Sequence, residues 1–142
     1  MSVEENIRAT EAGFEAFKAR DWDRLDELNA ESVVNTGPDL PEPVKGRDAL
    51  LEYWKTFVNA FPDANIEDLR TFGQGDLVVA EFIGTGTHNG PLPGPGGQTI
   101  PATNKAVRLP LCFVFKVEGG KTTELRRYYD LLGLMTQLGL AP

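Results

Sequence analysis

Residues 107–117 read VRLPLCFVFKV, and this stretch decides the fold. Every second residue, starting with the first valine, is apolar, whereas Arg108 and Lys116 belong to the intervening set. Successive side chains of a β-strand point to opposite faces, so the pattern predicts a strand with one face packed against other elements. We expect this strand to cover residues 99–118.

Strand-like segments flank this stretch on both sides. Periods near two and frequent β-branched or aromatic residues predict further strands at 32–36, 64–73, 76–88 and 121–129. Gly73 to Asp76 and the pair Gly119-Gly120 have the composition of hairpin turns, because glycine adopts positive φ without penalty. We therefore expect a curved antiparallel sheet.

Helical patterns dominate the first part of the chain. Apolar residues recur at helical spacing in 3–19, 21–30 and 46–61, and a short closing helix is predicted within 131–139. Ser2 with Glu5 three residues later has the form of a capping box, and Pro62 stops the third helix. Three helices followed by a run of strands predict an α+β fold in a single domain, residues 1–142.

A Gly/Pro-rich segment, GPLPGPGG at residues 90–97, joins two of the predicted strands. Glycine and proline dominate it, so we expect that it neither pairs as sheet nor continues as helix. It is either a surface loop near a cavity mouth or a tolerated insertion, and the insertion is the simpler interpretation.

The charge and the scarcity of cysteine and histidine exclude several classes of function. Asp and Glu total 21 against 14 Lys and Arg, and the net charge of −7 repels nucleic acid and anionic membranes. Cys112 and His88 are the single cysteine and histidine, which excludes an intrachain disulfide and a Cys/His zinc cluster; we predict no metal site. No Gly-x-Ser-x-Gly motif supplies a hydrolase nucleophile. The acidic start, residues 1–5, lacks an apolar signal segment and favours a cytoplasmic location.

Alternation sorts the side chains of two predicted strands into faces. In 76–88 it places His88 on the face of Val78, Ala80 and Phe82. In the last strand it separates two sets, Glu124, Arg126, Tyr128 and Asp130 against Leu125, Arg127 and Tyr129. A sheet curved over three helices encloses a cavity for a ligand, and we expect the first, more polar set to face it.

Asp130 stands where the last predicted strand meets the apolar tail. We expect its carboxyl group to be partly buried, and burial raises a carboxyl pKa toward the range of a useful general base. The alternative is a structural carboxylate that caps the tail helix and pairs with Arg126 or Arg127. His88 has a similar alternative, as a hydrogen-bonded structural histidine beside glycines.

Three segments resemble the SnoaL-like polyketide cyclase (ester cyclase) family: DLLGLMTQLG at 130–139, FPDA at 61–64 and GTHNG at 86–90. Weaker matches, AFKARDWD at 16–23 and GRDAL at 46–50, are similar to the wider nuclear-transport-factor-2-like superfamily. The resemblance covers nearly the whole chain. It implies a cone-shaped α+β barrel, a small-molecule substrate, homo-oligomers (dimer or tetramer) formed through the sheet, and no metal or organic cofactor.

The resemblance also implies a mechanism. In the true cyclases an aspartate at the end of the last strand is the general acid/base of an intramolecular aldol ring closure, and Asp130 matches that position. Asp130 would remove a C–H proton beside an ester carbonyl and return it to the alkoxide that forms when the enolate attacks a second carbonyl. His88 matches the family's Gly-Thr-His motif and would hydrogen-bond the substrate or orient Asp130. Both are predicted as catalytic residues.

Five further residues are predicted to bind the substrate: Tyr128, Arg126, Phe82, Trp54 and Asn35. For Arg126 the alternative is a solvated pair with Glu124, and for Trp54 it is a place in the apolar core. Arg126 stands where family members often carry an aromatic residue, and residues 102–105, ATNK, replace their Pro-Thr-Gly-Arg. These departures predict a more polar cavity than a flat aromatic polyketide needs.

Other activities stay open on the same fold. A ketosteroid-isomerase-like enzyme would use one carboxylate to remove a proton from a steroid-like ketone, and an epoxide-hydrolase-like enzyme would use a carboxylate and an arginine to activate water. Arg126 or Arg108 beside Asp130 would favour the hydrolase. A cavity filled by its own side chains would instead indicate a non-catalytic small-molecule-binding module.

Overall fold

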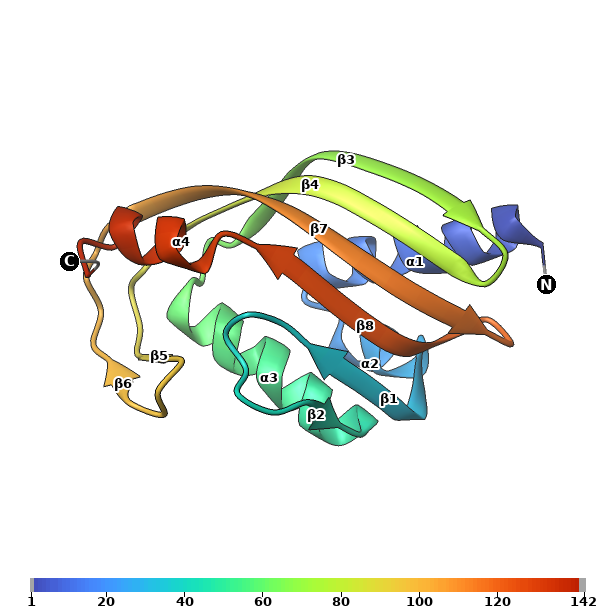
Figure 1. The fold of residues 1–142 in the computed structure, drawn as a ribbon, viewed down its shortest axis with the longest axis horizontal. Coiled ribbons are helices and arrows are strands. Elements are labelled where there is room, and N and C mark those ends of the chain that lie inside the picture. The colour runs from blue at the N-terminus through green and yellow to red at the C-terminus, as the bar shows by residue number, and fades with distance from the viewer. Residues whose placement is uncertain (1, 141–142) are drawn as a thin grey trace.

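A six-stranded sheet in the order β2-β1-β8-β7-β4-β3 is the framework of the protein, which a computed structural model describes over residues 2–140 (Figure 1). Its strands are β1 (Asn29–Thr36), β2 (Val44–Lys45), β3 (Asn65–Gln74), β4 (Leu77–Thr87), β7 (Ala106–Glu118) and β8 (Lys121–Tyr129). Neighbouring strands are antiparallel except β1 and β8, which run parallel with Asn35 opposite Leu125. The antiparallel prediction is therefore correct for every pair of this sheet but one.

The predicted strand 99–118 is in fact two strands, β6 (Thr99–Ile100) and β7. Residues 101–105 lie between them without regular structure, and Asn104 adopts the left-handed conformation with φ 60°. The Asn104 N–H donates to the His88 carbonyl at 2.8 Å instead of continuing a ladder. The strands β3, β4 and β8 lie within two residues of their predicted bounds.

The described residues form four helices: α1 (Val3–Lys18), α2 (Trp22–Glu27), α3 (Arg47–Ala60) and α4 (Leu131–Gln137). The predicted capping box starts α1, because the Ser2 hydroxyl accepts the Glu5 N–H and the Glu5 carboxylate accepts the Ser2 N–H. Helices α1 and α3 cover one face of the curved sheet, and α4 follows directly from β8 (Figure 1). The α+β prediction is confirmed.

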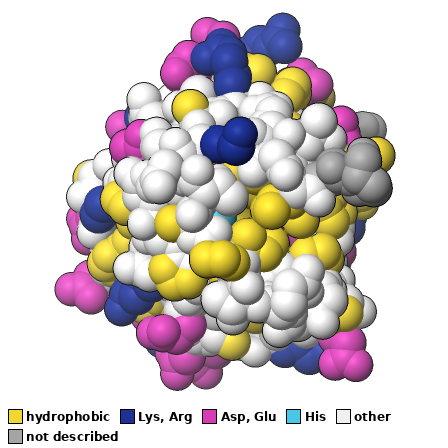
Figure 2. All heavy atoms as spheres, turned by 90° about the vertical axis from the view of Figure 1, so that its left-hand side faces the viewer, with side chains coloured by type: hydrophobic (Ala, Val, Ile, Leu, Met, Phe, Trp, Pro, Cys, Tyr) yellow, Lys and Arg dark blue, Asp and Glu magenta, His cyan; other side chains and the backbone are white. Residues whose placement is uncertain are grey.

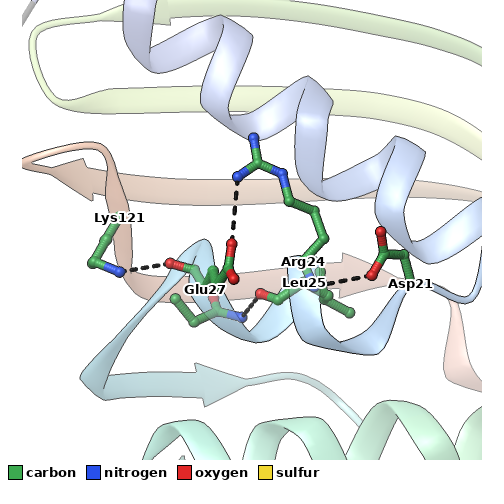
Figure 3. A network of polar contacts seen from close by, with 6 residues as sticks. Asp21, Arg24, Leu25, Glu27 and Lys121 are labelled. Atoms are coloured by element: carbon green, nitrogen blue, oxygen red, sulfur yellow. Dashed lines mark hydrogen bonds and ion pairs between the residues drawn. The ribbon is translucent and has the colours of Figure 1, made fainter.

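Helix α2 is held at the start of β8, as Figure 3 shows. The Asp21 carboxylate accepts the Arg24 N–H at 3.1 Å and caps the helix. Lys121 Nζ donates to the Glu27 carbonyl at 2.6 Å and so joins the helical layer to the sheet. The helix ends at Glu27 rather than near residue 30, because Asn29 already belongs to β1 and pairs with Thr122 of β8.

An aromatic core joins α1 to the inner face of the sheet. The rings of Phe14 and Phe82 meet edge to face with centroids 5.1 Å apart, and those of Phe82 and Phe113 do so at 4.9 Å. Such pairs stabilise by about 0.5–1.5 kcal/mol beyond the burial of their area. A second cluster, around Phe61 and Leu138, packs the end of α3 against the end of the chain's last helix. The two clusters hold the helices that enclose the site.

The Gly/Pro-rich segment forms a small hairpin outside the main sheet, made of β5 (Leu92–Pro93) and β6. The prediction that residues 90–97 cannot pair as sheet is wrong, because Leu92 pairs with Ile100. The Gly94 N–H donates to the Gln98 carbonyl at 2.7 Å and closes the turn. Glycine suits this turn because a Cβ at position 94 would lie 2.5 Å from the Gln98 side chain.

Candidate active site

A cavity of about 490 Å³ lies between the inner face of the sheet and the helices α1 and α3. This volume falls within the range of roughly 300–1,000 Å³ that is usual for small-molecule sites. Figure 2 shows hydrophobic side chains gathered on the end of the molecule where α4 and the β5–β6 hairpin lie. Residues of that hairpin line the cavity. The segment 90–97 is therefore a loop at the cavity mouth, and the simpler interpretation as a tolerated insertion is wrong.

The wall of the cavity is mainly aromatic and aliphatic. Phe82 of β4 and Trp54 of α3 both line it, which is where the sequence places them, together with Phe14, Phe113 and Leu125. Trp54 packs edge to face on Phe57, with centroids 6.4 Å apart, and Phe82 is buried. The free-energy cost of desolvation on binding an apolar ligand would be small, because few polar groups of the protein lose contact with water.

Four side chains form a polar cluster on this apolar wall: Arg127 and Tyr129 of β8, Tyr53 of α3, and Asp39 of the loop after β1. Arg127 is only 4% exposed, and its Nη2 donates to Asp39 Oδ1 at 2.8 Å. The Tyr53 hydroxyl donates to the other oxygen of the Asp39 carboxylate. A buried guanidinium is stable only when paired and hydrogen-bonded in this way.

Neighbouring groups fix the position of the Arg127 guanidinium. Its Nε donates to Asn35 Oδ1 at 2.8 Å, and its plane lies over the Tyr53 ring at 4.7 Å. Gly37 lets the loop pass close by, because a Cβ at that position would lie 2.5 Å from Nη2. Asn35, predicted to bind substrate, is fully buried behind Arg127 and acts on it rather than on the cavity.

The two phenols of the cluster are hydrogen-bond donors at neutral pH. Burial raises the pKa of Tyr53 and of Tyr129, and the nearby Asp39 carboxylate raises both further. The hydroxyls therefore keep their protons well above pH 7. Tyr53 donates its proton to Asp39, so Tyr129 and the Arg127 guanidinium are the groups that can donate to an oxygen atom of a ligand.

The face assignment of the last strand is wrong for two predicted residues. The cavity takes Leu125, Arg127 and Tyr129, whereas Arg126 and Tyr128 lie on the opposite, outer face. Tyr128 is 55% exposed, and Arg126 forms the alternative pair with Glu124 at 2.9 Å. Alternation correctly separates the two sets, but both sets contain an arginine and a tyrosine, so these two residue types alone do not show which set turns inward.

Asp130 is exposed, and the expectation of partial burial is wrong. Its carboxylate accepts the Gly133 N–H at 2.7 Å and caps α4, as the structural alternative has it. Its side chain is not among the described groups that line the cavity. Arg108 does not accompany it either, because the Arg108 guanidinium pairs with Glu67 at 2.9 Å. The catalytic role of Asp130 stays a prediction.

His88 is fully buried, on the predicted inner face but outside the set of cavity-lining residues within 2–140. Its ring stacks on Phe61 with centroids 5.3 Å apart. Nδ1 accepts the Thr103 N–H at 3.2 Å, so the ring proton is on Nε2, which has no partner among the described residues. Burial lowers the pKa of His88 and keeps the ring neutral at pH 7. The cavity thus does not bring His88 and Asp130 together.

The sequence interpretation missed Asp39, Tyr53, Arg127 and Tyr129. Asp39 lies in a Gly-Pro loop that carries no recognisable motif, and Arg127 follows another arginine. One signal was present, because the set opposite Arg126 is otherwise apolar and so is the natural inner face. Within residues 2–140, no group of three or more His, Cys, Asp or Glu side chains is arranged to hold a metal ion.

A family model described as SnoaL-like polyketide cyclase matches residues 7–138. The chain belongs to this family. No curated protein sequence matches the chain. None of the helices in the described part of the chain is long and apolar enough to cross a membrane.

Solved structures of SnoaL-like proteins share the fold over nearly their full length. A candidate SnoaL-like polyketide cyclase from Jannaschia sp. CCS1 is 22% identical, with a TM-score of 0.85 over 98% of this chain and 94% of that one. A candidate polyketide cyclase from Xanthomonas campestris pv. campestris is 24% identical, with a TM-score of 0.81 over 96% and 98%. An LEH-like epoxide hydrolase from M. tuberculosis is 21% identical, with a TM-score of 0.70 over 96% and 90%. At these identities the likeness shows the nuclear-transport-factor-2-like fold.

Proposed function

We propose that this SnoaL-like protein is a cofactor-free enzyme that moves a proton on a small carbonyl-bearing molecule, in an aldol-type ring closure or a related lyase or isomerase reaction. One observation carries the proposal: a carboxylate, a guanidinium and two phenols meet at one place on an otherwise apolar cavity wall. A base beside several oxygen-binding donors is the equipment that enolate chemistry needs.

The proposed steps use only the polar cluster. Tyr129 and Arg127 donate hydrogen bonds to the substrate carbonyl oxygen, and the Asp39 carboxylate removes the proton from the adjacent carbon. The electron pair of that C–H bond forms the enolate, whose negative oxygen the same donors stabilise. The enolate carbon then attacks a second carbonyl of the molecule, and the new alkoxide takes the proton back from Asp39.

Asp130 and His88 are the alternative acid/base pair, because both match motifs of the family. We favour Asp39 because it lines the cavity, whereas Asp130 is exposed and caps α4. A matched pair of variants separates the two assignments. Asp39→Asn removes the proposed base, and Asp130→Asn removes the charge but leaves an amide that still caps the helix.

Exchange of α-protons for deuterium tests the proposal directly. The probe is 1-tetralone in D₂O, followed by ¹H NMR with the purified protein. We expect catalysed exchange that falls about 100-fold or more in Asp39→Asn and changes less than about threefold in Asp130→Asn, since a general base contributes about 10²–10⁴-fold. Loss of exchange in Asp130→Asn with full exchange in Asp39→Asn would reverse the assignment, and no exchange with the wild-type protein would contradict the proposed function.

An epoxide hydrolase is the second candidate function. A specific observation favours it, because Arg127 and Asp39 are a paired arginine and carboxylate inside the cavity, and one fold relative is described as an epoxide hydrolase. In that reaction the oxygen of a water molecule would bond to an epoxide carbon as the C–O bond of the ring breaks, and Asp39 would take a proton from this water. The alkoxide from the opened ring would then take that proton from Asp39, which gives the diol and restores the carboxylate. Release of a diol from 1,2-epoxytetralin, absent in Asp39→Asn, would support this candidate over the carbonyl chemistry.

We also propose that the protein forms a homo-oligomer through the outer face of the sheet. Tyr128 and Phe72 expose 55% and 51% of their surface, and they stand on β8 and β3 of that sheet. Aromatic side chains are enriched in protein–protein interfaces relative to the rest of the surface. Sedimentation velocity tests the proposal: a dimer or tetramer that dissociates in Tyr128→Glu supports it, and a wild-type monomer contradicts it.

A further inference from the structure

The distribution of polar groups in the cavity limits the kind of molecule that fits it. Three lining residues carry a charge, Asp39, Arg127 and Glu52, and Glu52 is exposed on α3. The other two are joined in one ion pair at 2.8 Å. Charged groups inside the cavity are therefore confined to the polar cluster.

Among the described residues, two of the three buried neutral polar residues of the wall, Thr10 and Asn29 but not Thr122, have side chains that are hydrogen-bonded to the protein itself. The Thr10 hydroxyl donates to the Asn6 carbonyl at 3.0 Å, and the Asn29 amide donates to the Leu25 carbonyl at 3.1 Å. The hairpin at the mouth adds only apolar side chains, such as Leu92 and Ile100. A ligand oxygen that lies away from the polar cluster would thus meet mainly hydrocarbon, apart from the side chains of Thr56, Asn65, Thr85 and Thr122.

The polar cluster offers donors to a neutral acceptor. Arg127 Nη1 makes no hydrogen bond with any residue in 2–140, although Nε and Nη2 both do. The Tyr129 hydroxyl, which burial keeps protonated at neutral pH, lines the cavity on the same face of β8 as Arg127. Because the Asp39 carboxylate already neutralises the guanidinium, an anionic ligand gains little extra from the pair, and a carbonyl oxygen gains two hydrogen bonds.

We propose that the natural substrate is a largely hydrocarbon molecule with one oxygen-bearing end, such as a bicyclic monoketone or lactone, and not a polyhydroxylated aromatic polyketide. This inference rests on the proposed function, because it names the substrate class of the same site. It selects the isomerase form of that reaction, in which Asp39 returns the proton to a carbon of the enolate, since a monoketone has no second carbonyl to attack. The single oxygen accepts from Arg127 and Tyr129, and the hydrocarbon skeleton fills the space lined by Phe82, Phe113 and Trp54. A second or third oxygen at the far end of the skeleton would be buried without a partner and weaken binding about tenfold each.

A series on one ring skeleton tests the inference by binding alone. The probes are tetralin, 1-tetralone and 6,7-dihydroxy-1-tetralone, with no oxygen, one oxygen and three oxygens. Trp54 reports binding through its fluorescence, and Trp22→Phe removes the other tryptophan, which does not line the cavity. We expect the Kd of the dihydroxyketone to exceed that of 1-tetralone at least tenfold. Equal or tighter binding of the dihydroxyketone would overturn the inference.

A pair of neighbouring tyrosines provides the matched control. Tyr129→Phe removes one donor of the cluster without changing ring shape, and Tyr128→Phe makes the same change on the outer face. We expect the preference for 1-tetralone over tetralin to fall about fivefold in Tyr129→Phe and to stay the same in Tyr128→Phe. An equal response of the two variants would overturn the assignment of the oxygen end to the cluster.

Binding and exchange fail separately, so the two proposals can be told apart. Selective binding of 1-tetralone without α-proton exchange contradicts the proposed function and leaves the substrate class supported. Catalysed exchange combined with tighter binding of the dihydroxyketone supports the function and overturns the substrate class.

Discussion

The two faces of β8 carry the same residue types in opposite surroundings. Arg126 and Tyr128 stand on the outer face, where the arginine pairs with Glu124 on its own strand. Arg127 and Tyr129 stand on the inner face, where the arginine is buried and held by Asp39 and Asn35. Neighbours in sequence thus differ entirely in environment, and access to the cavity depends on the face and not on the residue type.

The difference also explains why Arg127 is tolerated inside. An unpaired guanidinium would be costly to bury, whereas a guanidinium with a carboxylate, an amide oxygen and an aromatic face around it is compensated. That compensation comes from the loop after β1 and from α3, both distant from Arg127 in sequence. Mutations that separate the two faces test this comparison.

The largest effect is expected from the paired arginines. Arg127→Met leaves Asp39 with one buried partner fewer and should lower the free energy of unfolding by about 3 kcal/mol. Arg126→Met removes only a half-exposed pair and should change it by less than about 1 kcal/mol. Urea denaturation followed by circular dichroism measures both. Equal losses in the free energy of unfolding would show that the inner ion pair stabilises the fold no more than the outer one.

A smaller loss of stability is expected from a substitution in the loop that passes the Arg127 guanidinium. Gly37→Ala places a Cβ 2.5 Å from Arg127 Nη2, so the guanidinium must shift, with a cost of about 1–3 kcal/mol. Gly13→Ala in α1 is the control, because the nearest atom to its Cβ is 4.0 Å away and alanine favours a helix. We expect thermal unfolding at lower temperature for the first variant and at an unchanged or higher temperature for the second. Unchanged stability of Gly37→Ala would mean that the guanidinium is mobile.

Two substitutions of Asp130, the N-cap of α4, should lower the free energy of unfolding by different amounts. Asp130→Ala removes the acceptor for the Gly133 N–H and should destabilise by about 1 kcal/mol, whereas Asp130→Asn retains an acceptor and should cost a few tenths. Chemical denaturation of the two variants beside the wild type measures the difference. If both variants were equally unstable, the negative charge rather than the cap would be what matters at this position.

The smallest effect is a pH dependence of stability from His88. Burial lowers the pKa of the folded-state imidazole below its unfolded value of about 6.5. The unfolded chain therefore binds a proton that the folded chain does not, so stability is complete above about pH 6.5 and falls as the pH drops toward the folded pKa. In His88→Asn, which keeps an acceptor near the Thr103 N–H but does not titrate, the free energy of unfolding should fall less between pH 7 and pH 5. A matching slope in wild type and variant would assign the effect to other groups.

Periodicity predicted most of the fold because helices and strands here follow local rules. The Ser2 capping box starts α1, and side chains alternate along β7 and along β8 from Glu124 onward, after a register shift between Thr122 and Glu124. The parallel pairing of β1 with β8 was not predicted, since Asn35 and Leu125 are far apart in sequence and nothing local links them. The break at Asn104 was missed for a related reason, because its left-handed backbone is stabilised by a contact with His88.

The candidate site could be predicted only in part. Phe82 and Trp54 were placed correctly because apolar side chains on a strand or helix stripe have one natural direction. Arg126 and Tyr128 were placed wrongly because a period of two gives parity and does not say which face is inside. The deciding group, Asp39, neutralises Arg127 from a loop whose position depends on the whole fold.

One measurement tests the central claim most directly, because two of the three tyrosines, Tyr53 and Tyr129, line the cavity and the third, Tyr128, stands on the outer face of the sheet. The protein is labelled with ¹³C at tyrosine Cζ and titrated with 1-tetralone. Resonances of Tyr53 and Tyr129 should shift as the ketone binds, and that of Tyr128 should stay in place. A shift of Tyr128 with no change at Tyr53 and Tyr129 would contradict the account.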